Sequence, residues 1–353
     1  MSQPLHIAQL MLSSQNGGAE TFFEKLALAL ADRGVKQHLY IEPDERRMAL
    51  FANHPMLEVV PIRFRGIHEP LGHLKLHASL MRHRPQALLT WMSRAIKRAP
   101  TRYCPVIARL GGYYRVPRYR KATRLVGNTP DIVRYLVEEG IPADKALCIP
   151  NFGEVADSGM SRDEARRRLR AEFSIPDNHQ VLLNLGRLHK AKAQDVLIAA
   201  LAQTSNTTLL IAGDGALRPD FEAQISALGL TGRVHLLGWR RDTAYLFAGA
   251  DLCVFPSREE PFGNVVVEAW SQQTPLIAAR SQGPAWLIED QRTGLLVDID
   301  DAEGLAAAIR DLQFNPEKAQ QLAIAGQQRF EEAFSADAIC AQYIELFKSL
   351  RPE

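Results

Sequence analysis

Short hydrophobic runs alternate with longer helical patterns along the first half of the chain. An apolar run at 5–12 leads into a glycine loop, "SSQNGGAE", and then into a helical pattern at 21–34 that ends at Gly34, a typical glycine C-cap. Further strand-like runs lie at 36–42, 57–62, 87–91, 105–110, 124–128 and 146–150. Strands that alternate with helices predict βαβ units on a parallel sheet.

The second half repeats this alternation without repeating the sequence. After "IPNFGE", residues 149–154, a polar linker precedes strand-like runs at 180–186, 207–213, 233–238, 251–256, 275–279 and 293–298. Because 353 residues exceed the usual size of one hydrophobic core, we expect two domains. The predicted fold is α/β, with two facing, Rossmann-like, doubly wound parallel-sheet domains and a ligand cleft between them. The expected domains are 1–155 and 156–334, and a final helix in 335–353 is expected to pack back toward the first domain.

Charge is distributed unevenly along this chain. Residues 1–150 carry 22 Lys and Arg against 12 Asp and Glu, a balance of +10, and the remainder carries 20 against 28, a balance of −8. The segment "RLGGYYRVPRYRKATR", residues 109–124, mixes arginines with tyrosines. We expect it to contact an anionic acceptor or membrane surface; a basic solvated surface without a partner is the alternative. Nucleic acid is not expected, because no known nucleic-acid-binding module is present. The candidate contacts are Arg109, Arg115, Arg118, Arg120 and Lys121.

Hydropathy bears on where the protein works. No stretch approaches the roughly 20 apolar residues that span a bilayer, and the opening "MSQPLHIAQL" lacks the features of a signal peptide. We expect a cytoplasmic protein that is peripheral to the inner face of the plasma membrane. The helix-like stretch at 71–85 places Leu74, Leu80 and Met81 among basic residues, so it suits either that surface or ordinary packing.

Two carboxylates flank a glycine turn in "REEPFGNVVVEAW", residues 258–270. With Asn264 as the expected N-cap, the amides of the first helical turn form a site for phosphate at the positive end of the helix dipole. Glu260 and Glu268 can then accept hydrogen bonds from the hydroxyls of a sugar and a ribose, as a nucleotide-sugar requires. The alternative is a solvated turn acid and a favourable charge near a helix start. The candidate amides belong to Phe262, Gly263, Asn264 and Val265.

Two basic residues follow the strand predicted at 180–186 in the second half of the chain. The strand ends at Gly186, and Arg187 and Lys192 precede the next helix, where they can stabilise the charge of a diphosphate leaving group. "IAGDG" lacks the third glycine of a dinucleotide fingerprint. The acids of "VDIDD", ending at Asp301, are better explained as helix caps than as metal ligands. We expect no metal site.

Several motifs together resemble a known family. "GRLHKAK", "IAGDG", "VHLLGW", "FPSREEPFGNVVVEAW", "PLIAA" and "TGLLVD" have the order and spacing of the retaining GT-B glycosyltransferases of family 4, and they cover essentially all of the second half. In the first half, "NGGAETFFEKLALALADRG" and "IPNFGE" are similar to the glycine loop, first helix and hinge of that family.

The resemblance implies roles for individual residues. Glu260 and the amides of Phe262 and Gly263 would hold the donor sugar, and Glu268 would hold the ribose. Arg187 and Lys192 would bind the diphosphate, facing the amides of Gly17 and Gly18. Trp239 and Arg240 would seat the nucleobase, although Trp239 equally suits a core position. "GGYY", residues 111–114, stands where many relatives have a histidine, so no catalytic histidine is expected.

The predicted function follows from these roles. We expect a retaining, metal-independent hexosyltransferase without a cofactor, which uses a UDP- or GDP-linked sugar and a lipid-linked or phosphorylated glycan acceptor. The acceptor is expected to bind to the domain of residues 1–155 and the nucleotide-sugar to that of residues 156–334. The N-terminal half is similar to bacterial enzymes that build lipopolysaccharide core or cell-surface glycans. A nucleotide-sugar epimerase on the same fold and a non-catalytic nucleotide-sugar-binding protein are the alternatives.

Overall fold

The structure is a computed structural model that describes residues 5–13, 17–64, 66, 69–155 and 158–350. The chain divides into two compact units. The N-terminal unit comprises residues 1–151 and 336–353, and the C-terminal unit comprises residues 152–335. The final helix therefore belongs to the same unit as the first strands, although it is last in the sequence.

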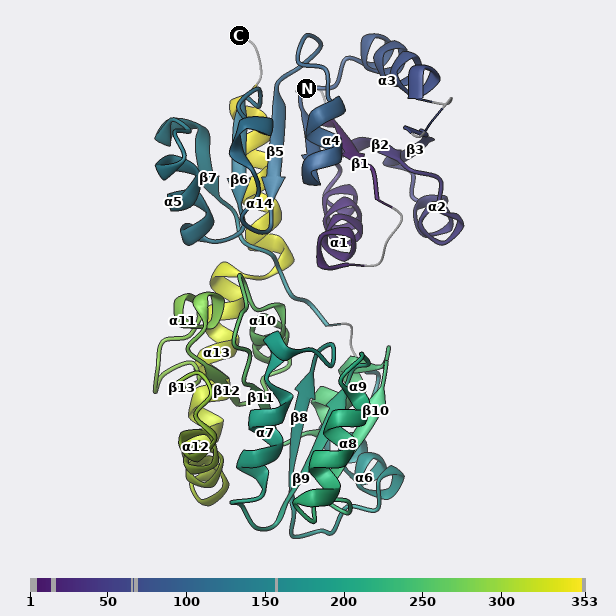
Figure 1. The fold of residues 1–353 in the computed structure, drawn as a ribbon. Helices are drawn as coiled ribbons and strands as arrows, with labels where there is room; N and C mark the ends of the chain where they lie inside the picture. The colour runs from purple at the N-terminus through teal and green to yellow at the C-terminus, as the bar shows by residue number, and fades with distance from the viewer. Residues whose placement is uncertain (1–4, 14–16, 65, 67–68, 156–157, 351–353) are drawn as a thin grey trace. The chain divides into compact units, whose positions relative to one another are not determined.

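The N-terminal unit is a doubly wound parallel sheet (Figure 1). Its strand order is β3 (Leu57–Pro61), β2 (Lys36–Ile41), β1 (His6–Met11), β4 (Leu88–Trp91), β5 (Val106–Leu110), β6 (Arg124–Gly127) and β7 (Ala146–Cys148). Its helices are α1 (Gly18–Asp32), α2 (Glu45–Phe51), α3 (Glu69–His83), α4 (Met92–Arg98), α5 (Pro130–Glu138) and α14 (Ala336–Ser349). The predicted glycine C-cap is confirmed, because Gly34 follows α1 with φ 78°.

The C-terminal unit repeats this architecture. Its strand order is β10 (Val234–Gly238), β9 (Thr207–Ala212), β8 (Gln180–Leu185), β11 (Leu252–Phe255), β12 (Leu276–Ala279) and β13 (Leu295–Val297), with all strands parallel. The helices are α6 (Arg162–Glu172), α7 (Gln194–Leu201), α8 (Arg218–Ala227), α9 (Thr243–Gly249), α10 (Asn264–Ser271), α11 (Gln282–Leu287), α12 (Ala302–Phe314) and α13 (Pro316–Ala333). The predicted α/β class is thus confirmed.

The strand order reverses direction at one point in each sheet. In the N-terminal sheet β1 lies between β2 and β4, and in the C-terminal sheet β8 lies between β9 and β11. Ligands of doubly wound sheets bind outside the carboxyl ends of the strands at such a switch point. The loops that follow β8 and β11 therefore stand where the C-terminal unit is built to bind a ligand.

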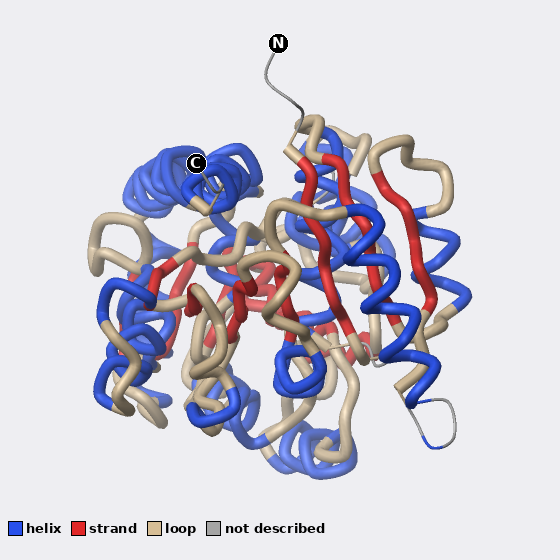
Figure 2. The backbone as a smooth tube through the Cα atoms, turned by 90° about the horizontal axis from the view of Figure 1, so that it is seen from above, coloured by secondary structure: helices blue, strands red, loops and turns tan. Residues whose placement is uncertain are grey.

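Strand side chains in the C-terminal unit alternate between two hydrophobic layers, as the two-residue period of a strand requires. Val181 and Leu183 pack with residues of α6, α9 and α10, whereas Leu182 and Val254 pack with residues of α7, α8 and α12. Helices therefore cover both faces of this sheet, as is usual for parallel sheets. Figure 2 shows the helices and strands of the chain from above.

One close contact fixes the position of α10. Trp270 is fully buried and donates a hydrogen bond from Nε1 to the Thr293 carbonyl at 2.7 Å. Gly326 of α13 lies directly against the Trp270 ring, where a Cβ atom would come within 2.3 Å of Cδ1. The absence of a side chain at 326 thus lets α13 support the helix that carries Glu268.

Helix α14 packs on the N-terminal unit through a buried face that includes Ile339, Tyr343 and Phe347. It contacts α1, and Arg33 beyond the end of α1 hydrogen-bonds to Asp337. Within the described ranges, no helix is both long enough and apolar enough to cross a membrane.

Replacing Gly326 with Ala is expected to destabilise the C-terminal unit. Within a helix, alanine raises the free energy of unfolding by about 0.5–1 kcal/mol relative to glycine. Overpacking a core lowers it by about 1–3 kcal/mol. Since the Trp270 ring is held by its hydrogen bond, we expect a net loss of about 1 kcal/mol in the free energy of unfolding, measured in urea. Gly232→Ala, in the turn before β10, is the control for an added methyl group without a steric contact, since its Cβ meets nothing within 4 Å. Equal stabilities of the two variants would contradict this packing argument.

Candidate functional site

The loops that follow β8 and β11 are joined to one another. The backbone amides of Arg258 and Glu259 donate hydrogen bonds to the Ala191 carbonyl at 2.9 and 3.3 Å. The Arg258 guanidinium bonds to Asp195 at 2.6 Å, to Asp300 at 2.5 Å and to the Lys190 carbonyl at 2.7 Å. Arg258 was not among the predicted site residues, although it opens the motif that contains them. Its role is to hold the two loops together.

This junction brings Lys192 and Glu260 into contact. Lys192 Nζ donates to Glu260 Oε2 in an ion pair, and it also lies 5.6 Å from the centre of the Phe255 ring. The two side chains are 27% and 16% exposed, so solvent reaches the pair. Two predicted residues from loops 68 positions apart therefore form one charged group at the switch point. Gly186 lies beside them, because a Cβ atom there would be 3.8 Å from Lys192 carbons.

Close backbone approaches hold these loops in position. The Gly283 amide donates to the Glu260 carbonyl at 2.8 Å, and a Cβ atom on Gly283 would lie 2.0 Å from the Phe262 carbonyl oxygen. Similarly, a Cβ atom on Gly213 would lie 1.9 Å from the Gly186 carbonyl oxygen. The first glycine of "IAGDG" is thus explained by packing of one loop on another.

The start of α10 differs from the prediction. The expected N-cap, Asn264, is the exposed first residue of the helix, and the N-cap is Gly263 in a left-handed conformation with φ 99°. A left-handed cap is easiest for glycine, and it lets the chain turn sharply from the loop into the helix. Phe262 and Gly263 are buried, Val265 is half-buried, and half-buried Glu268 is the fifth residue of α10.

The remaining predicted donor residues of the C-terminal unit are exposed to different degrees. Arg187 is exposed, and its side chain makes no ion pair within the described part of the chain. Trp239, at the end of β10, is 74% exposed, so the core alternative for this residue is wrong. Arg240 bonds to Asp242 at 2.6 Å and to Glu172 at 2.9 Å, and these bonds raise the pKa of its guanidinium. β9 separates β10 from β8, so Trp239 stands apart from the ion pair.

Among the acids of "VDIDD", the predicted role of helix cap is confirmed for Asp301 only. Asp301 caps α12 by accepting a hydrogen bond from the Gly304 amide at 2.8 Å. Asp300 pairs with Arg258, and Asp298 lies 4.0 Å from Arg280.

In the N-terminal unit, Gly17 and Gly18 begin α1 at the carboxyl end of β1. Gly17 is the N-cap, and Gly18 is the exposed first residue of the helix. Glu20, in the first turn, is 4% exposed and accepts a hydrogen bond from Ser13. Residues 14–16 of the predicted glycine loop lie outside the described residues.

Arg109 does not belong to the predicted basic surface. It is 3% exposed, and its guanidinium lies 4.4 Å from the centre of the Phe22 ring and 4.9 Å from that of Trp91. It hydrogen-bonds to Asn151, and burial lowers its pKa. The prediction was wrong because β5, which carries Arg109, is buried on both faces.

The rest of the basic segment is anchored by buried Val116, Tyr119 and Ala122, and it exposes Arg115, Arg118 and Arg120. Lys121 is also exposed, but its ammonium donates to the carbonyls of Lys97 and Ala99 at 3.1 and 2.8 Å. These carbonyls lie at the carboxyl end of α4, where a positive charge is favourable. Lys121 therefore supports the fold.

A cavity of about 550 Å³ lies beside α4, and we call it the cationic pocket. Arg94 and Arg98 in its lining pair with Glu42 at 3.2 Å and with Glu69 at 2.8 Å. Among the described residues, no ion pair engages Lys97 or Arg118. The pocket thus carries an excess of positive charge suited to an anion. It is lined by Ser93, Arg94, Lys97, Arg98, Arg118 and Lys121.

Comparison with known proteins gives consistent matches. The family profile described as "Glycosyl transferases group 1" matches residues 165–329. The lipopolysaccharide core biosynthesis glycosyltransferases LpsE and LpsD of Rhizobium meliloti (strain 1021) are 34% and 32% identical, over 95% and 94% of this chain and 97% and 95% of theirs. The crystal structure of Anabaena Alr3699/HepE in complex with UDP and glucose aligns with a TM-score of 0.82 and 24% identity, covering 98% of this chain and all of that one. This last likeness concerns the fold, and it confirms the predicted GT-B class.

Replacing Arg258 with Met is expected to loosen the junction between the loops. The lost charged hydrogen bonds are partly solvent-exposed, so their contribution is about 1 kcal/mol, or about fivefold in the local opening equilibrium. Hydrogen–deuterium exchange of residues 187–193 and 256–263 should accelerate by this factor. Arg240→Met is the matched control, because Arg240 also bonds two carboxylates but lies outside the junction. Unchanged exchange in Arg258→Met would show that the backbone bonds alone hold the loops.

Proposed function

The chain belongs to the group 1 glycosyltransferases, and from this premise we propose that it transfers a hexose from a nucleoside-diphosphate sugar to a lipid-linked or phosphorylated glycan. We further propose that transfer retains the anomeric configuration, needs no metal, and serves lipopolysaccharide core or cell-surface polysaccharide synthesis. The names of LpsE and LpsD, which are lipopolysaccharide core biosynthesis glycosyltransferases, support the proposed role in lipopolysaccharide core synthesis. The UDP and glucose in the HepE complex support a nucleotide-sugar donor. No comparison supports the epimerase alternative, since the named relatives are transferases.

The contact between Lys192 and Glu260 carries the donor proposal. Each neutralises the other at the switch point of the C-terminal sheet, where a ligand of this fold binds. A diphosphate would attract the Lys192 ammonium and release the Glu260 carboxylate to accept hydrogen bonds from the sugar hydroxyls. Exposed Arg187, on the loop that follows β8, would add a second cation. Glu268 on α10 would take the ribose, and Trp239 offers an exposed ring on which a base can stack.

The proposed chemical step needs no protein nucleophile. The acceptor oxygen forms a bond to the anomeric carbon as the bond from that carbon to the diphosphate oxygen breaks. The acceptor proton passes to the departing phosphate on the same face of the sugar. Lys192 and Arg187 stabilise the negative charge that grows on the phosphate, which is the part of such a reaction where fixed charges have the largest effect.

The cationic pocket supports an anionic acceptor. Its excess of Lys and Arg suits the phosphate groups of a phosphorylated or lipid-linked glycan. Lys97 and Arg118 are the residues proposed to bind these groups. The pocket belongs to the N-terminal unit, which was predicted to bind the acceptor.

One face of α3 supports contact with a membrane surface. Leu71, Leu74 and Met81 are 64%, 66% and 60% exposed, and exposed Lys75 and Arg82 lie on the same helix. Apolar side chains with flanking cations are typical of a helix that rests in an anionic lipid interface. Leu80, grouped with Leu74 and Met81 from the sequence, is instead fully buried in the core. This face of α3, with Leu71, Leu74 and Met81, is called the apolar face.

Glu260→Gln and Lys192→Met are expected to separate the roles of the ion pair. In Glu260→Gln, Lys192 loses its neutralising partner, so UDP or GDP should bind at least as tightly as to the wild type, while the affinity added by the hexose should fall. In Lys192→Met, both the nucleotide and the nucleotide-sugar should bind about 10- to 100-fold more weakly, since a charged hydrogen bond contributes about 1.5–3 kcal/mol. Isothermal titration with UDP, GDP and their hexose conjugates measures both effects.

Transfer to a lipopolysaccharide core acceptor supplies the second readout, with the anomeric configuration of the product determined by NMR. Lys192→Met and Arg187→Ala should each lower turnover about 10²- to 10³-fold. Wild-type turnover in both variants would refute the assignment of these cations to the diphosphate. An inverted product would refute retention, and conversion of the donor without acceptor would favour an epimerase.

Replacing Leu71, Leu74 and Met81 together by Ser is expected to weaken sedimentation with vesicles of phosphatidylglycerol and phosphatidylethanolamine. Replacing Arg115, Arg118 and Arg120 by Ser should reduce it at low salt by at least about tenfold, because basic residues near an anionic surface contribute about 1 kcal/mol each. Phe314→Ser is the control, since Phe314 is 72% exposed in the C-terminal unit. Equal sedimentation of all variants and the wild type would remove the membrane from the proposal.

A further inference from the structure

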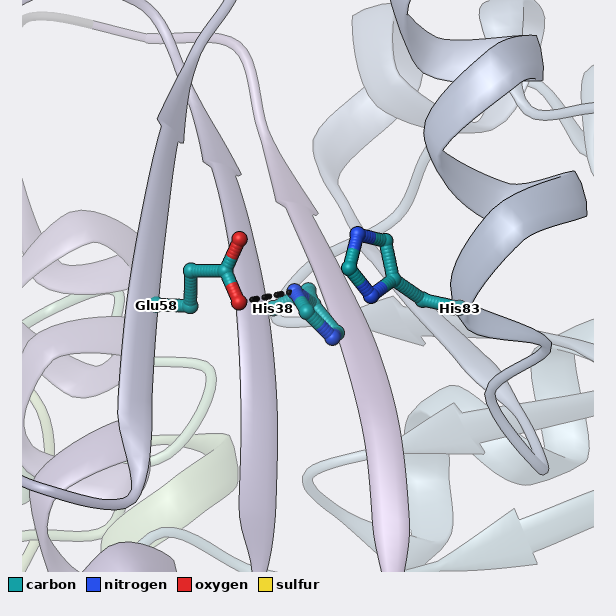
Figure 3. Close-up of side chains that lie close together, drawn as sticks. All are labelled: His38, Glu58 and His83. Carbon is teal, nitrogen blue, oxygen red and sulfur yellow. Dashed lines mark ion pairs between the residues drawn. The ribbon is translucent and has the colours of Figure 1, made fainter.

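His38, Glu58 and His83 meet at one point of the N-terminal unit, and we call them the histidine cluster. His38 on β2 pairs in register with Glu58 on β3, so both side chains stand on the same face of the sheet. His83 is the last residue of α3, which approaches the amino ends of the strands before the chain enters β4. Figure 3 shows the Glu58 carboxylate and the two imidazole rings turned toward one another.

The central residue of the cluster is buried without hydrogen bonds. His38 is 0% exposed, and neither of its ring nitrogens has a hydrogen-bond partner among the described residues. Leaving a buried polar atom unsatisfied costs about 1–3 kcal/mol, so native structures rarely do so. Glu58 Oε2 lies 3.3 Å from His38 Nδ1 as an ion pair without hydrogen-bond geometry. The rings of His83 and His6 have their centres 4.0 and 4.8 Å from that of His38, so all three neighbours are of metal-ligand types.

The distances fit a small tetrahedral ion. Zn²⁺ binds histidine nitrogen and carboxylate oxygen at about 2.0–2.2 Å, which places neighbouring ligand atoms of a tetrahedron about 3.4 Å apart. His38 Nδ1 and Glu58 Oε2 are 3.3 Å apart, and one ligand atom from each member of the histidine cluster lies within 4.8 Å of the others. The largest separation that this limit allows between two ligand atoms exceeds the distance expected around a tetrahedral ion by about 1.4 Å. Rotation of the half-buried His83 side chain can bring its ring nitrogen closer by that amount.

We propose that the histidine cluster binds a divalent transition metal ion of the zinc type, with His38, Glu58 and His83 as ligands. Two imidazoles and one carboxylate are a common ligand set for Zn²⁺, with solvent in the fourth position. Glu58 is 53% exposed at its side chain, which leaves a path for the ion to enter. This site was not expected from the sequence, because its members lie at 38, 58 and 83.

The charge state of the cluster suits a cation. A metal ion binds the neutral form of an imidazole, through the lone pair of one ring nitrogen. The Glu58 carboxylate supplies negative charge. Lys36 places an opposing positive charge near His38, but its side chain is exposed and can turn toward solvent.

Such an ion would join β2, β3 and the end of α3. The cluster lies toward the amino ends of these strands, whereas Gly17 and the other residues proposed for substrates follow the carboxyl ends. The inferred role is therefore structural: the ion would fix the end of α3, the helix that carries the apolar face. This inference does not depend on the proposed transferase reaction.

Titration of the full-length, chelator-treated protein with Zn²⁺ tests the site. We expect binding of one equivalent and a rise in the melting temperature, because an ion that binds only the folded state stabilises it. Glu58→Gln, which conserves shape at an exposed side chain, and His83→Ala should each weaken binding at least about tenfold. Both variants leave the buried His38 in place, and circular dichroism checks that they fold.

His77→Ala is the matched control, because His77 also lies on α3. His73 and His77 are spaced by four residues, with ring centres 6.4 Å apart, so they form a potential surface zinc site; His77 Nδ1 is already 3.0 Å from the Tyr103 hydroxyl. We expect wild-type affinity in His77→Ala. Loss of binding in His77→Ala with retention in Glu58→Gln and His83→Ala would overturn the proposal, as would the absence of stoichiometric binding by the wild type.

Discussion

The arrangement of the candidate site depends on one ion pair, between Lys192 and Glu260, across the switch point of the C-terminal sheet. Parallel β8 and β11 are neighbours, so the loops at their carboxyl ends emerge side by side. Arg258 and the Ala191 carbonyl then join the two loops. Without this junction, nothing would hold the loop of Lys192 against the loop of Glu260. With it, a cation and a carboxylate stand together, as the proposed nucleotide-sugar donor requires.

Backbone packing places these charges as much as side-chain bonding does. The amide of Gly283 supports the Glu260 loop, and Gly326 lets α13 lie against Trp270 beneath α10. At each position a Cβ atom would come within 2.3 Å of a neighbouring atom, so a glycine is favoured there. The motif that carries the family resemblance therefore relies on residues outside it, which are drawn from α11 and α13.

Cations in this protein divide into those that hold the structure and those that face solvent. Arg109, Arg258 and Lys121 each bind a ring, a carboxylate or a helix end within the fold. Arg187 and Arg118 are exposed, and no ion pair engages either of them among the described residues. Only the second group suits a ligand, so net charge by itself overstates the binding surface of the N-terminal unit. The same unit holds the cationic pocket beside α4 and the histidine cluster near the amino ends of β2 and β3.

Local patterns in the sequence determined the strands, most helices, the Gly34 and Asp301 caps and the α/β class, because strand and helix periods depend on near neighbours. The family motifs also named Lys192 and Glu260. Tertiary structure decided the rest. It buries Arg109, exposes Trp239 and brings His38 close to His83. Each outcome depends on which elements pack together. Such contacts join residues far apart in the chain, and no periodicity within a single segment records them.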